Sequence, residues 1–156
     1  MSVTFQVEKT AKLFSDLLNR VVTTKVGAPP AATYDPAIVA SYAVDSGDLV
    51  AVCVCDLEFT LNGGAALCLI PAPEAARNAK AKRLDPLLFE NFTEILNICA
   101  QLFGGSNTQR VKLASVYSKI GDAPAGVKEI IEKGRVRREI QVSIAGYGTG
   151  RMAVFC

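Results

Sequence analysis

The sequence predicts a single α+β domain in which a unit of one helix and three strands occurs twice, in residues 1–78 and 79–156. Two observations support this prediction. The hydrophobic pattern gives the same order of elements in each half of the chain. In addition, residues 14–19 and 92–97 match in residue class at every position, and they lie 78 residues apart, which is half the chain length.

The first half is expected to open with an amphipathic helix over 7–26, because Phe14 and Leu18 fall on an apolar face. Strands are expected to follow over 38–44, 49–59 and 65–70. The middle run is almost entirely apolar as far as Cys55, which is typical of a central strand covered on both faces. The sequence Asn62-Gly63-Gly64 indicates a hairpin turn before the third strand.

The second half is expected to open with a polar connection and then carries the strongest helix signal in the chain, over 85–103. Asp85 can cap this helix, Pro86 suits its first turn, and Gly104 follows its end. The connection is expected over 71–83, the strands over 111–117, 136–144 and 151–155, and a short helix over 127–132.

The overall composition argues against several classes of function. The formal net charge of the 156 residues is only +2, which gives no reason to expect a nucleic-acid partner. No apolar run reaches the roughly 18 residues that a membrane helix needs. Residues 1–5 also lack the charged-then-apolar layout of a secretion signal. We therefore expect neither a nucleic-acid partner nor a membrane partner.

Cysteine and histidine usage further restrict the chemistry. The five cysteines are an odd number and sit mostly in apolar runs, so buried free thiols in the cytoplasm are expected. Cys53 and Cys55 share a strand face, but no second pair completes a metal site, so we expect no metal. The chain has no histidine, which removes the commonest general base and metal ligand. Any catalysis must use carboxylates, amides, lysines or groups of a partner.

One face of the helix over 85–103 is polar. At 100° per residue, four of its polar side chains fall within an arc of about 60°. These residues are Glu90, Glu94, Asn97 and Gln101. Glu94 and Asn97 therefore present a carboxylate and an amide to solvent, one turn apart. On a convex surface this pair can reach into a partner's site but cannot enclose a small molecule, and the alternative is a plain solvated face.

The stretch Glu94-Ile95-Leu96-Asn97 resembles the Glu-x-x-Asn signature of the CheC/CheX phosphatases of bacterial chemotaxis. The resemblance covers nearly the whole chain, from the leading helix through the glycines Gly63-Gly64 and the strand ending at Pro71 to the closing strands. It implies a CheC-like fold, a duplicated helix-plus-three-strands unit with two long helices packed on β-sheet.

The resemblance also implies a function, namely dephosphorylation of a phosphorylated CheY-type response regulator. Asn97 would orient the attacking water, and Glu94 would pair with a lysine of the regulator. Glu90 and Gln101 would contact the same partner. No cofactor of its own is implied, because Mg²⁺ would be supplied by the regulator. Positioning one water is a large part of the task, since an aspartyl phosphate is already activated.

Some positions depart from the family pattern. Glu90 stands where Asp or Ser is usual, and Gln101 stands where a small residue is usual. In the first helix, Asp16 and Asn19 match Glu94 and Asn97, which implies either a second site or a degenerate copy.

Two alternatives to a phosphatase remain open. One is a non-catalytic CheC-like adaptor that binds a response regulator or a chemotaxis or motor-switch protein, and the other is a structural domain. A homodimer is also expected, because the apolar strand over 151–155 is predicted to lie at a sheet edge, where it can pair with a second chain.

Overall fold

In a computed structural model of the chain, residues 3–27, 34–105, 110–133 and 136–156 are described. The helices are α1 (Thr10–Leu18), α2 (Leu57–Leu67), α3 (Ala72–Lys80), α4 (Pro86–Cys99) and α5 (Ala125–Lys133), with 3-10 turns at Val7–Lys9, Ala100–Leu102 and Ile120–Asp122. The strands are β1 (Val3–Phe5), β2 (Val22–Val26), β3 (Ile38–Ala43), β4 (Leu49–Cys55), β5 (Phe103–Gly105), β6 (Lys112–Tyr117), β7 (Arg137–Ile144) and β8 (Gly148–Phe155). Within these residues, no helix has the length and apolar character that crossing a membrane requires.

Six strands form one antiparallel sheet in the order β2-β7-β8-β4-β3-β6, and β1 pairs with β5 separately. The order is symmetrical, because exchanging β2 with β6, β3 with β7 and β4 with β8 returns the same neighbours. The outer strands β2 and β6 are each the first strand of the large sheet after α1 and α4, respectively. The duplication of residues 1–78 and 79–156 stays a prediction from the sequence.

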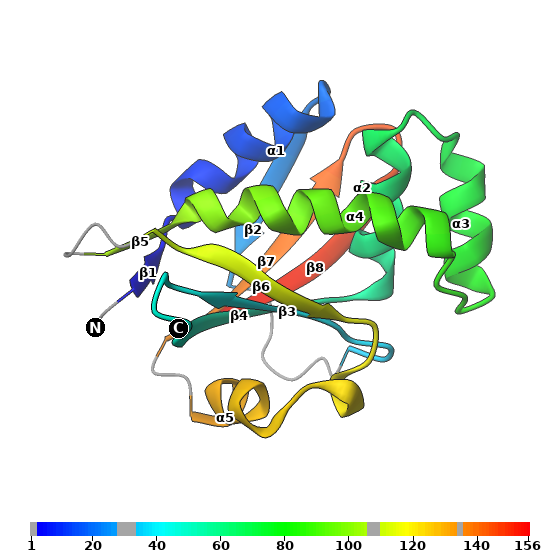
Figure 1. Cartoon of the computed structure of the whole chain (residues 1–156). Helices are drawn as coiled ribbons and strands as arrows, with labels where there is room; N and C mark the ends of the chain where they lie inside the picture. Colours follow the sequence, from blue (N-terminus) through cyan, green and yellow to red (C-terminus); the bar gives the residue numbers. More distant parts are fainter. Residues whose placement is uncertain (1–2, 28–33, 106–109, 134–135) are drawn as a thin grey trace.

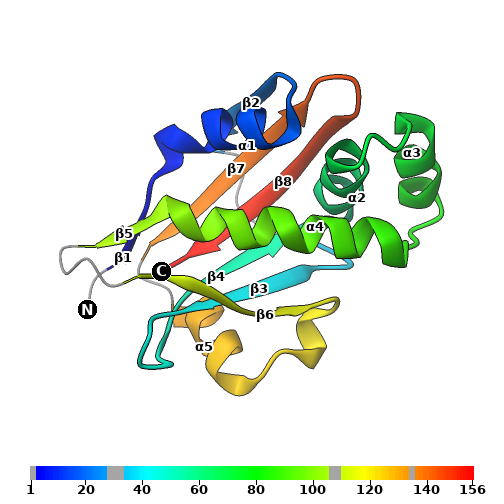
Figure 2. The ribbon, with the colours of Figure 1, turned by 45° about the horizontal axis from the view of Figure 1, so that its top comes forward.

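The helices cover the two faces of the large sheet unequally. α1 and α4 lie across one face, and α5 lies on the opposite face (Figures 1 and 2). α2 packs on α4 and β8, and α3 packs on α2. Two main hydrophobic clusters result, one between the sheet and α1, α2 and α4, and a smaller one between the sheet and α5.

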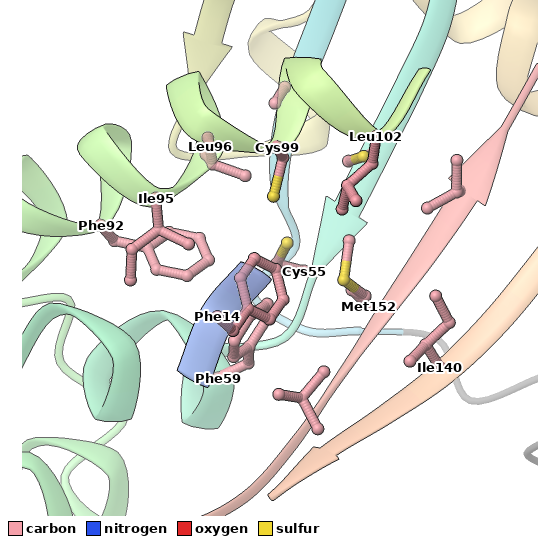
Figure 3. Close-up of a cluster of buried hydrophobic side chains, with 14 of the residues drawn as sticks. Phe14, Cys55, Phe59, Phe92, Ile95, Leu96, Cys99, Leu102, Ile140 and Met152 are labelled. Carbon is pink, nitrogen blue, oxygen red and sulfur yellow. The ribbon is translucent and has the colours of Figure 1, made fainter. Parts of the chain in front are cut away.

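Three phenylalanine rings join the helices at the centre of the larger cluster (Figure 3). Phe59 of α2 lies between Phe14 of α1 and Phe92 of α4, with ring centroids 5.8 Å and 5.0 Å apart. The sheet contributes further buried side chains to this cluster, among which are Cys55 and Met152. The position of α4 thus depends on both neighbouring helices as well as on the sheet.

The first helix is shorter than the sequence predicts. α1 ends at Leu18, because Asn19 adopts a left-handed conformation with φ 52° and its N–H donates to the carbonyl of Ser15. Val22–Val26 then forms β2, paired with β7, instead of the last turns of a helix. Its valines and threonines are β-branched, and such residues pack better on a pleated sheet than in a helix.

The predicted hairpin and third strand of the first half are wrong, because Leu57–Leu67 forms α2. Asp56 caps this helix by accepting a hydrogen bond from the Phe59 N–H at 2.8 Å. Gly63 and Gly64 lie inside the helix, where α2 meets α4 too closely for a side chain. α3 occupies most of the segment over 71–83 that was expected to be a connection.

The second half follows the prediction more closely. α4 and the turn Ala100–Leu102 fill the predicted helix, β6, β7 and β8 form as strands, and α5 contains the short helix. One expectation is wrong: residues 151–155 are not at an edge. They belong to β8, which pairs with β7 on one side and β4 on the other, so this strand has no free edge for a second chain.

Candidate functional site

The candidate site lies on α4, which begins where the sequence predicts. The Asp85 side chain accepts a hydrogen bond from the Leu88 N–H at 3.1 Å, and Pro86 occupies the first turn. The buried residues of α4 are Leu88, Phe92, Ile95, Leu96 and Cys99. Because this apolar face packs on the core, the opposite face of the helix is left to solvent.

The four polar residues predicted on that opposite face are all exposed. They are Glu90, Glu94, Asn97 and Gln101. Within the described part of the chain, neither Glu94 nor Asn97 engages its side chain in a hydrogen bond. Both groups are therefore available to a partner, and the carboxylate and amide emerge one turn apart on the same side of α4.

Two hydrogen bonds tie α4 to the first half of the chain. The buried Tyr42 hydroxyl on β3 donates to the carbonyl of Leu96 at 2.7 Å. Burial raises the pKa of Tyr42 well above its ordinary value, so the hydroxyl keeps the proton that it donates. Asn91 in turn donates from its amide to the carbonyl of Gly64 at 3.1 Å. The residue preceding Asn97 is thus tied to the sheet, which fixes where the exposed pair points.

A hollow of about 290 Å³ opens beside Asn97, at the C-terminal end of α4. Asn97 and Gln101 line this hollow together with Arg110, which lies just before β6, and Lys112, the first residue of β6. The remaining lining residues are Ile98, Ala100, Phe103 and Val111. The helix face is therefore not simply convex, as the sequence suggested, but borders a depression with cationic side chains.

A second hollow, of about 430 Å³, lies between α1 and the C-terminal end of α4. Gln101 borders both hollows. The second hollow is lined by Gln6, Lys9, Lys12, Leu13, Asp16, Gln101 and Leu102. The last turn of α4 and the 3-10 turn that follows it, which carry Asn97 and Gln101, therefore border two hollows.

The candidate pair on the first helix is arranged differently. Asp16 is exposed on α1, and its carboxylate lies 3.0 Å from the ammonium of Lys12. Asn19 follows the helix in a left-handed conformation, so it does not continue the face of Asp16. The structure therefore does not reproduce on α1 the arrangement of Glu94 and Asn97, in which both residues lie on one helix.

Three of the five thiols lie inside the core, whereas Cys68 is exposed and Cys156 is partly buried. Cys53, Cys55 and Cys99 are buried, and all five cysteines are free. Burial raises the pKa of the Cys53 thiol to about 12, so it stays protonated at neutral pH. No group of three or more cysteine or carboxylate residues in the described ranges is placed to hold a metal ion.

Sequence reasoning missed Tyr42, Arg110 and Lys112. Arg110 and Lys112 approach α4 only because β6 pairs with β3 at the edge of the sheet. Tyr42 reads locally as one more strand residue. No local pattern in the sequence marks these residues, since their role depends on contacts between distant segments.

No protein-family model matches the chain, and no curated protein is similar to it in sequence. Solved structures do match. The FliM middle domain from H. pylori superposes with a TM-score of 0.64 at 10% identity, covering 96% of this chain and 84% of that one. A chain of the CheX-CheY-BeF3-Mg+2 complex from Borrelia burgdorferi gives a TM-score of 0.50 at 14% identity, covering 96% and 93%.

The chain has the CheC/CheX-like fold. FliY from Thermotoga maritima shares it, with a TM-score of 0.54 at 12% identity over 96% of this chain and 83% of that one. In this CheC/CheX-like domain, α1 and α4 lie across one face of the sheet, and α4 is the second of them along the chain. The exposed face of α4 carries Glu94 and Asn97.

Proposed function

We propose that this chain is a phosphatase for the aspartyl phosphate of a CheY-type response regulator in chemotaxis or two-component signalling. The observation that carries the proposal is the exposed pair Glu94 and Asn97, one turn apart on an α4 whose backbone is tied to the sheet beside Asn97. The fold shared with a chain of a CheX-CheY complex supports the same partner class.

In the proposed reaction, Asn97 acts on a water molecule inside the regulator's active site. The carboxamide oxygen accepts a hydrogen bond from the water and aligns it with phosphorus. The new P–O bond forms as the bond to the aspartate oxygen breaks, releasing inorganic phosphate and a free carboxylate. An uncharged amide suits this role, because it does not repel the phosphoryl oxygens.

The other residues of the face bind the partner. Glu94 pairs with a lysine of the regulator, and Glu90 and Gln101 extend the contact along α4. The chain contributes no metal or other cofactor, and the regulator brings its own Mg²⁺. The absence of histidine fits this division of labour, since neither a protein base nor a protein metal ligand is required. We place this reaction in the cytoplasm.

The test is incubation of the purified chain with a panel of regulators phosphorylated on aspartate. Loss of phosphate from at least one regulator, faster than its own hydrolysis and proportional to chain concentration, is the expected result. A panel in which every regulator keeps its phosphate at the spontaneous rate would contradict the proposal.

A second candidate is a non-catalytic adaptor of the same fold. It is favoured by the structural match to FliM, whose solved complexes include FliG-FliM and FliM-SpeE from H. pylori. An adaptor would bind a regulator or a motor-switch protein through the same exposed face. Binding to a regulator without acceleration of phosphate loss would support this candidate over the phosphatase.

A further inference from the structure

The hollow beside Asn97 is rich in hydrogen-bond donors. Among the residues that line it, Asn97 and Gln101 contribute amides, and Arg110 and Lys112 contribute cations. None of the eight described residues that line it carries a carboxylate. Donors and cations in the lining favour an anionic occupant, because each donor forms a stronger hydrogen bond to a charged oxygen.

Arg110 is the cation most available to such an occupant. The ammonium of Lys112 lies 3.2 Å from the carboxylate of Asp45, which neutralises part of its charge. Arg110 is exposed and forms no ion pair with a carboxylate of the described residues. Its planar guanidinium presents paired N–H groups that match the oxygens of a phosphoryl or carboxylate group.

The charges divide the face of α4 into two parts. Glu90 and Glu94 make the first part anionic, whereas the part beyond Asn97 borders the cationic hollow. Asn97 lies at the boundary, because it is both on the exposed face and in the wall of the hollow. A partner that places a phosphoryl group against the Asn97 amide therefore also places the surroundings of that group over Arg110.

We propose that the hollow receives the negatively charged groups around the partner's phosphorylated aspartate. Arg110 would thereby distinguish the phosphorylated from the unphosphorylated partner. This inference rests on the proposed function, since it takes the same regulator as occupant. It adds a partner-binding residue outside α4, in a segment that the helix motif does not include. Arg110 acts through charge on the phosphorylated form, whereas Glu94 binds a lysine that both forms possess.

The first experiment measures affinity for one regulator with and without beryllofluoride and Mg²⁺, at low and at physiological salt. Arg110→Ala should weaken binding of the beryllofluoride form about tenfold and leave the unmodified form within about twofold. The salt dependence of binding should also become shallower. Arg110→Lys should retain part of the preference, because it keeps the charge but loses the paired donors.

Arg83→Ala is the matched control, since Arg83 is also an exposed arginine but lies before the N-terminal end of α4. It should preserve the preference for the beryllofluoride form. An equal loss for both forms of the regulator in Arg110→Ala, or the same loss in Arg83→Ala, would overturn the inference.

The second experiment uses the chain alone and inorganic phosphate as the probe. NMR resonances of the Asn97 and Gln101 side-chain amides should shift saturably in the wild type and in Arg83→Ala, but not in Arg110→Ala. Absence of these shifts in the wild type would overturn the anion site. If the shifts depend on Arg110 but the chain binds no regulator, the anion site would be supported. The phosphatase proposal would then be overturned independently of that site.

Discussion

At the scale of single residues, Asn97 carries the proposed chemistry while its side chain is exposed. Asn97→Ala should slow dephosphorylation by about 10²-fold, the scale expected when a reactant loses its alignment. Affinity for the regulator should stay within about twofold, because no charge is removed. The free energy of unfolding should change by less than about 0.5 kcal/mol. Single-turnover phosphate release, binding and urea denaturation measure the three quantities.

Asn97→Asp provides a sharper variant at the same position. It preserves the size of the side chain but brings a negative charge against the phosphoryl oxygens, so turnover should fall at least as far as in Asn97→Ala. An unfolded Asn97→Ala protein, or an active Asn97→Asp protein, would contradict the assigned role.

Glu94 should govern affinity instead of turnover. Glu94→Ala removes one member of an ion pair between proteins, which costs about 2–5 kcal/mol when the pair is fully buried and less at a wet rim. Glu132→Ala on α5, exposed on the opposite side of the sheet, is the matched control and should bind normally. Calorimetry with an unphosphorylated regulator measures the difference, and equal affinities for the two variants would refute the pairing.

Asp56 predicts a pH dependence of stability. Burial raises the pKa of this carboxyl from 3.8 to about 6, outweighing the Arg151 guanidinium 4.0 Å away. Between these two values the folded chain binds more protons than the unfolded chain, so the free energy of unfolding should fall as pH rises from about 4 to 6.

Asp56→Asn keeps a side chain that can cap α2 but does not titrate. The variant should gain on the order of 2 kcal/mol relative to the wild type at pH 7 and lose this advantage near pH 4. Urea denaturation across this pH range provides the measurement. A constant difference between the two proteins at every pH would show that the carboxyl does not titrate as described.

At the scale of elements, the contact between α2 and α4 depends on glycine. A Cβ on Gly64 would lie 2.1 Å from the carbonyl oxygen of Leu88, a backbone atom that no side-chain rotation can move. Gly64→Ala should therefore destabilise the fold by at least about 3 kcal/mol. Gly126→Ala in α5, where the added Cβ would meet only Leu49 at 3.7 Å, should instead be neutral or stabilising by up to about 1 kcal/mol. Thermal denaturation of both variants tests the contrast.

The same glycines explain where sequence reasoning about the fold failed. Asn62-Gly63-Gly64 carries a strong local hairpin signal, but the glycines serve a contact with α4 that no local pattern reveals. The predicted end of the first helix was wrong for a similar reason, because β2 pairs with β7 from the other half of the chain. In contrast, α4 was predictable, since Asp85, Pro86 and the apolar periodicity all act within the helix itself.

The candidate site was predictable to the same extent. A helix brings together residues three and four apart, so the exposed face of Glu90, Glu94, Asn97 and Gln101 followed from spacing alone. Arg110 reaches the site only through the pairing of β6 with β3. Tyr42 supports it from within the sheet. Both contacts depend on the complete fold.

At the scale of the whole molecule, we propose that the chain forms the homodimer expected from the sequence, but through a contact other than residues 151–155. The outer strands of the large sheet are β2 and β6, not β8, so pairing between the large sheets of two chains would use one of these two strands. Light scattering at micromolar concentration should give twice the mass of the chain, and a monomeric mass would count against the dimer.

Because β8 lies between β7 and β4, the large sheet cannot be completed before residues 148–155 have left the ribosome. Until then, β2 can pair only with β7, and β4 and β6 only with β3. β4 places five residues in the finished core, and one of its edges stays open throughout this interval. Its pairing of Val52 with Phe155 joins distant segments, which is a slow step in folding. Until β8 has emerged, the nascent chain therefore presents an apolar strand edge, the kind of surface that chaperones bind and that leads to aggregation.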